Sequence, residues 1–170
     1  VDLGLKHLLT EYGIDLEADK VNIAPVPGAF TGKNVNFGVT AARALQDGKI
    51  DGFWANGMGA EVAVKSGAGT LVIDARRGDG PSSAFNYTMP ALITSEKLIS
   101  ENPDACAAAV RALVKTQNAL KDNYKLATEV GRKRFPAEEA ELIADIIQRD
   151  LPFYNATITP EFISGMSSFS

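Results

Sequence analysis

Three chemically versatile residues are almost missing from this sequence. Among its 170 residues, cysteine, histidine and tryptophan occur once each, as Cys106, His7 and Trp54. A single cysteine excludes a disulfide within the chain. One histidine beside one cysteine leaves no cluster of the ligands that zinc prefers, and it leaves a serine–histidine–acid triad without support. We therefore expect no metal, no cofactor and no catalytic residue, and we expect Cys106 to have a structural place on an alanine-rich helix.

Long hydrophobic runs and an excess of positive charge are also missing. No apolar run approaches the roughly 20 residues that span a bilayer. The net charge of −4 and the pI near 5.0 argue against nucleic acid as a partner. The carboxylates Asp51, Asp74 and Asp79 are scattered and form no evident acid–base pair. With 45% apolar and 22% charged residues, the chain has the composition of a soluble protein with one domain or two small lobes.

What the sequence does contain is a succession of regular elements, clearest in residues 39–65. Residues 40–46 favour a helix, and Gly48 is the expected left-handed residue at its end. Residues 50–55 are short, aromatic and mostly apolar, which is typical of a buried parallel strand. Residues 56–59 predict a tight glycine turn, and residues 60–65 predict the next helix.

Similar patterns predict the rest of the chain. Helices are expected over residues 2–12 and through most of the chain after Ser95, where Asn102 and Pro103 mark the start of a long helix. Loop-forming residues over 76–83 mark the best domain boundary. Helices alternating with short strands predict an α/β fold. The further strands are expected over residues 21–26, 70–75 and 87–94.

The ends of the predicted strands indicate a binding site. In open α/β sheets, ligands lie beyond the carboxyl ends of the strands, and the amides that start a following helix favour an anion or a polar oxygen. Each candidate also has an ordinary structural explanation, since Trp54 can fill a core, Asn56 can cap a helix and the glycines can simply turn the chain. The candidate ligand-binding residues at these ends are Ala29, Phe30, Trp54, Asn56, Gly57 and Met58.

Two adjacent arginines add a candidate contact for an anion. Arg76 and Arg77 follow the last strand predicted before the boundary. A guanidinium can hold a carboxylate, sulfonate or phosphate through two parallel hydrogen bonds. The alternative is that both arginines are solvated charges of a hinge.

Two segments carry a resemblance to a known family. Residues 44–51 read Ala-Leu-Gln-Asp-Gly-Lys-Ile-Asp, and residues 92–103 join the last predicted strand to the Asn-Pro start of the long helix. In the order and spacing of these segments, the chain resembles the periplasmic solute-binding proteins of ABC importers. The nearest branch is the one for nitrate, sulfonate, taurine and thiamine precursors. The resemblance covers nearly the whole chain.

The resemblance implies a type II periplasmic-binding-protein-like α/β fold, present as one lobe plus the carboxyl-terminal helical part of the other. Residues 1–75 would form most of lobe two, residues 76–86 the hinge, and residues 87–170 the carboxyl-terminal part of lobe one. Because the chain begins with Val1, we expect a processed or cut product that lacks the family's amino-terminal half. The predicted helices carry more apolar surface than the few strands can bury, so we also expect pairing with that half or a homodimer.

The function implied by the resemblance is capture of a small organic or anionic solute without chemistry. The protein would deliver the solute to an ABC permease, in the periplasm or another extracytoplasmic location, and would meet the membrane only through that permease. The chain departs from the family at the ligand turn, where Asn56, Gly57 and Met58 stand, so the ligand class stays open. Two alternatives use similar lobes: the effector-binding domain of a transcriptional regulator, and an enzyme similar to thiamine-pyrimidine synthases.

Overall fold

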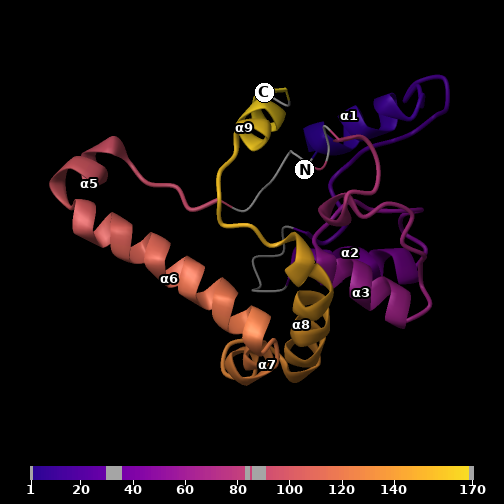
Figure 1. The fold of residues 1–170 in the computed structure, drawn as a ribbon. Coiled ribbons are helices and arrows are strands. Elements are labelled where there is room, and N and C mark those ends of the chain that lie inside the picture. Colours follow the sequence, from indigo (N-terminus) through magenta and orange to yellow (C-terminus); the bar gives the residue numbers. More distant parts are fainter. Residues whose placement is uncertain (1, 30–35, 83–84, 86–90, 169–170) are drawn as a thin grey trace. The chain divides into compact units, whose positions relative to one another are not determined.

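The computed structural model describes residues 2–29, 36–82, 85 and 91–168 and divides the chain into two compact units. Unit 1 comprises Val1–Phe85 with Ser168–Ser170, and unit 2 comprises Asn86–Ser167. Unit 1 holds the helices α1 (Asp2–Glu11), α2 (Phe37–Gln46) and α3 (Gly57–Lys65) and the short 3-10 helix η1 (Ala75–Arg77) (Figure 1). Unit 2 holds α5 (Glu96–Glu101), α6 (Pro103–Asp122), α7 (Leu126–Gly131), α8 (Ala137–Asp150), η2 (Leu151–Phe153) and α9 (Pro160–Ser168).

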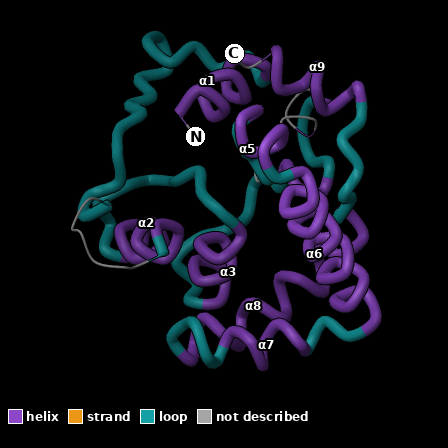
Figure 2. Tube along the Cα trace, turned by 90° about the vertical axis from the view of Figure 1, so that its left-hand side faces the viewer, coloured by secondary structure: helices purple, strands orange, loops and turns teal. Residues whose placement is uncertain are grey.

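The predicted α/β fold, and with it a type II periplasmic-binding-protein-like fold, is wrong for the described part of the chain. None of its residues lies in a β-strand (Figure 2). Residues 21–26, 50–55 and 91–94 are loops, residues 70–74 form a loop before η1, and residues 87–90 lie outside the described residues.

The physical reason is that a strand needs a partner, whereas β propensity only says that a segment would fit a sheet. Residues 50–55 and 70–73 have the right side chains for strands. Their amides and carbonyls, however, make no backbone hydrogen bond to another described residue. The apolar pattern of these segments was identified correctly, but the sheet that it predicted is absent from the described residues.

The predicted helices are confirmed, because their signals are local. Gly48 follows the end of α2 with a φ of +67°, as its left-handed role requires. The side chain of Asn102 accepts a hydrogen bond from the Ala105 amide at 3.1 Å, and Pro103 occupies the first turn of α6. Within the described residues, no helix is both long enough and apolar enough to cross a membrane.

Two helices of unit 1 pack directly on each other, α2 on α3, as both views show (Figures 1 and 2). Their backbones touch where Gly38 meets Gly59. A Cβ atom added to Gly59 would lie 2.7 Å from the Cα of Gly38, so only glycine fits this crossing. Buried alanines of α2 and the buried Ala63 of α3 line the rest of the contact region. Helices that were predicted to cover a sheet therefore bury their apolar faces against each other.

Unit 2 is built around a second helix pair, α7 with α8. Ala140 is completely buried, and a Cβ atom on Gly131 would lie 3.3 Å from the Cβ of Ala140. Across the same pair, Arg132 donates from its Nη2 atom to Glu141 Oε1 at 2.6 Å. The long helix α6 packs on α5 and α7, but none of its own residues is buried.

Candidate functional site

A cleft of about 400 Å³ in unit 1 is the candidate site. Its walls come from α1, from α3 and from the loops on either side of α3. A mainly apolar wall with a few polar groups is the usual make-up of a small-molecule site. The apolar wall includes Leu5, Leu8, Leu9, Phe53, Trp54, Leu71, Val72 and Ile73, and the polar part includes Asn56, Gly57, Asp74 and Arg76.

The polar end of the cleft is organised by two asparagines that cap neighbouring helices. Asn56 Oδ1 accepts from the Gly59 amide at 3.1 Å and so caps α3. Asn36 Oδ1 accepts from the Gly38 amide at 2.9 Å and from Asn56 Nδ2 at 3.2 Å. The amino-terminal ends of α2 and α3 are therefore tied together, and their partial positive charges point to the same region.

The first turn of α3 presents backbone donors at the cleft. The amides of Gly57 and Met58 donate to no other described residue, and Gly57 lines the cleft. The Arg76 guanidinium lies against Gly57, where a Cβ atom would collide with its Nη1 and Cζ atoms. Position 57 therefore needs glycine because of a neighbouring cation, a reason that the sequence did not reveal.

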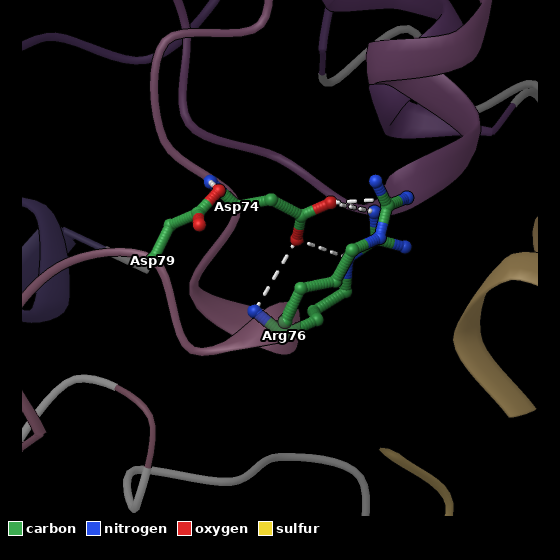
Figure 3. A network of polar contacts seen from close by, with 4 residues as sticks. Asp74, Arg76 and Asp79 are labelled. Carbon is green, nitrogen blue, oxygen red and sulfur yellow. Dashed lines mark hydrogen bonds and ion pairs between the residues drawn. The ribbon is translucent and has the colours of Figure 1, made fainter. Parts of the chain in front are cut away.

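Arg76 is held in place by a buried carboxylate (Figure 3). Asp74 is only 4% exposed and accepts from the Nε, Nη2 and backbone amide of Arg76 at 2.9, 2.7 and 3.2 Å. Arg77 Nη2 lies 3.2 Å from Asp74 Oδ2, and the Asp74 amide donates to Asp79 Oδ2 at 3.1 Å. Two guanidinium groups thus share one buried carboxylate.

The environment of Asp74 lowers its pKa. Burial by itself would raise this pKa, but the side-chain hydrogen bond and the charge of Arg76, together with the charge of Arg77, outweigh burial. Asp74 is therefore ionised at neutral pH and locks both arginines around η1.

The predicted site residues fall into three groups. Trp54, Asn56, Gly57 and Arg76 all line the cleft, so the structure brings these four together. Met58 is buried in α3, Arg77 binds Asp74, and Ala29 is exposed in a turn. Phe30 lies outside the described residues. Whether any of them contacts a ligand stays a prediction.

Sequence reasoning missed two parts of the site. The first is the leucine wall from α1, although Leu5, Leu8 and Leu9 already showed an amphipathic helix whose apolar face needed a neighbour. The second is Asp74, which was noted only as a scattered carboxylate. The spacing Asp-x-Arg-Arg, which allows a local ion pair across a tight turn, was the available signal.

The arrangement suits binding better than chemistry. No group of His, Cys, Asp and Glu side chains that could hold a metal ion occurs within the described ranges. The cleft combines an apolar wall with backbone donors, and the carboxylate of Asp74 is already bound by arginine. No protein-family model, no curated protein and no solved structure matches this chain.

Proposed function

We propose that this protein captures a small organic solute that carries an anionic group, without chemical conversion. One observation carries the proposal: a largely apolar cleft has backbone donors of a helix amino terminus and an arginine at one end. The apolar body of the solute would lie along the leucine wall and Trp54. Its oxygen atoms would lie at the Gly57 and Met58 amides, where the helix dipole favours negative charge.

The balance of charge at the polar end indicates which forces would dominate. Much of the Arg76 charge is compensated by Asp74, so this cation alone supplies limited attraction for an anion. Burial of the solute's apolar part contributes roughly 25 cal/mol for each Å² removed from water. The proposed solute is therefore an organic anion with a sizeable apolar part.

The proposed place of this capture is an ABC importer, with the protein outside the cytoplasm and its solute passed to a permease. This part rests on the resemblance of residues 44–51 and 92–103 to importer binding proteins, and it does not depend on an α/β fold. Genes for a permease and an ATPase next to the gene of this protein would support it. A DNA-binding segment encoded in the same reading frame would favour the regulator alternative instead.

The fluorescence of Trp54, the only tryptophan, tests the capture itself. We expect saturable changes with benzoate or butanesulfonate and a weaker response with the neutral analogue benzamide. Gly57→Ala should weaken binding, because its methyl group displaces the Arg76 side chain and covers the amide end of the cleft. Lost polar contacts of this kind cost about 0.5–3 kcal/mol.

A matched variant controls for the added methyl group. Gly52 also lies at the cleft, but a Cβ atom there meets nothing within 4 Å, so Gly52→Ala should bind the probes as the unmodified protein does. Equal affinity of the Gly57→Ala and Gly52→Ala proteins would reject the assignment of the polar end. No saturable change with any of the three probes would contradict capture of an organic anion.

A further inference from the structure

The long helix α6 has an apolar side that no other part of unit 2 buries. At 1.5 Å per residue, its 20 residues extend for about 30 Å. Val110 is 53% exposed and Leu113 is 48% exposed, and no residue of the helix is buried. Apolar side chains that remain this exposed along a whole helix mark an interaction surface.

The spacing of these side chains indicates that the missing neighbour is another helix. Alternating steps of four and three residues are the pattern of a coiled-coil seam, in which each side chain inserts between side chains of a facing helix. A sheet or a flat surface would not require this alternation. The seam consists of Cys106, Val110, Leu113, Gln117 and Leu120, which we call the α6 seam.

The charges beside the seam indicate which helix fits. Glu101 and Asp104 lie at the amino-terminal end of α6, whereas Arg111, Lys115 and Lys121 lie in its second half, with Asp122 as the carboxylate there. Two copies in parallel would place like charges next to each other. Two antiparallel copies place the acidic end of each beside the basic half of the other, and their helix dipoles are also opposed.

We propose that this protein forms a homodimer through antiparallel pairing of the α6 seams of two copies. The greatest overlap of two such seams interleaves Val110 of one copy with Leu113 of the other at the centre. On either side of this centre, Cys106 of one copy faces Gln117 of the other. The polar Gln117 weakens the pairing but helps to fix its register, as single polar residues do in coiled-coil seams.

Gln117→Cys tests both the pairing and its direction. Residues 106 and 117 of one helix are about 16 Å apart along its axis, whereas a disulfide needs Cα atoms about 4.4–6.8 Å apart, so an intact helix cannot join them. Mild oxidation should therefore give a covalent dimer of the Gln117→Cys protein, while the unmodified protein stays uncrosslinked. Asn118→Cys is the matched control, because position 118 is turned about 100° around the helix and should not cross-link.

The same experiment separates the other possible occupants. A parallel pair would place the two copies of Cys106 together, so cross-linking of the unmodified protein would overturn the antiparallel arrangement. If another part of the same chain or a different protein covered the seam, neither cysteine variant would cross-link, and the proposal would fail.

Light scattering with non-covalent dimers provides a second readout. Leu113→Glu places a charge at the centre of the seam and should raise the dissociation constant of the dimer by at least about tenfold. Ala108→Glu adds the same side chain on the outer face and should leave it unchanged. Circular dichroism checks that both variants keep their helices. A monomeric unmodified protein at the concentrations used for cross-linking, or equal effects of the two glutamates, would overturn the proposal.

Discussion

The Asp74 carboxylate shows how one residue can order a site that it was not expected to join. Its side chain is almost fully buried, yet two arginines supply the charge that compensates for burial. Through Arg76 it also determines what can stand at position 57, on the opposite wall of the cleft. Asp74 is therefore a positioning residue for the polar end of the cleft.

The lowered pKa of Asp74 gives a pH-dependent stability with a definite sign. A carboxylate whose pKa is lower in the folded state stabilises that state above its unfolded pKa, and this stabilisation is lost as the pH falls through the folded pKa. Asp74→Asn should reduce the free energy of unfolding at neutral pH by about 1–3 kcal/mol. The difference from the unmodified protein should shrink as the pH falls below the ordinary value of 3.8.

Urea unfolding at a series of pH values from neutral to strongly acidic measures this difference. Asp51→Asn is the control, because Asp51 is an exposed carboxylate at the same cleft. It should show little change in stability at any pH. A difference between Asp74→Asn and the unmodified protein that stayed constant across the series would mean that the ionisation of Asp74 does not stabilise unit 1.

Four residues of the candidate cleft could be found from the sequence because each has a local signal. Trp54, Asn56 and Gly57 follow an apolar run, and Arg76 follows the next one. The close approach of Arg76 to Gly57 could not be found, because it joins two loops that only the folded chain brings together. The same limit applies to the leucine wall of α1.

Helices and strands differed in how far the sequence determined them. α2 and α6 have caps, end glycines and apolar faces within their own residues, so their positions could be predicted. Residues 50–55 and 70–73 have β propensity but depend on distant partners for their hydrogen bonds. Such partners cannot be inferred from the segments themselves, and for this reason the fold class was wrong while the helices were right.

The crossing of α2 and α3 yields a prediction at the level of elements. Gly59→Ala should destabilise unit 1, because the new methyl group would collide with the Gly38 backbone. Overpacking of this kind costs about 1–3 kcal/mol, and the higher helix propensity of alanine returns at most about 1 kcal/mol. Chemical denaturation followed by Trp54 fluorescence measures the change. The control Gly52→Ala should leave the midpoint where it is, and a Gly59→Ala protein as stable as this control would show that the two backbones are not in contact.

At the scale of the whole molecule, the chain consists of two units that each contain their own helix pair. A substitution in the α2–α3 pair should therefore act on unit 1, and one in the α7–α8 pair should act on unit 2. The proposed α6 pairing adds a further difference between the units, because association stabilises only the part of the chain that takes part in it.

These differences predict two thermal transitions that respond to different changes. Gly59→Ala should lower only the transition of unit 1, and Ala140→Leu should lower only that of unit 2, since Ala140 is completely buried against α7 and has no room for a larger side chain. For domains of this size, each kcal/mol moves a midpoint by about 4–8 °C. Because the α6 seam belongs to unit 2, raising the protein concentration should raise only the midpoint that Ala140→Leu lowers. Calorimetry of the three proteins at low and high concentration measures both effects. A single transition moved by both substitutions would show that the units unfold together, and two transitions independent of concentration would count against the dimer while leaving the two-unit description intact.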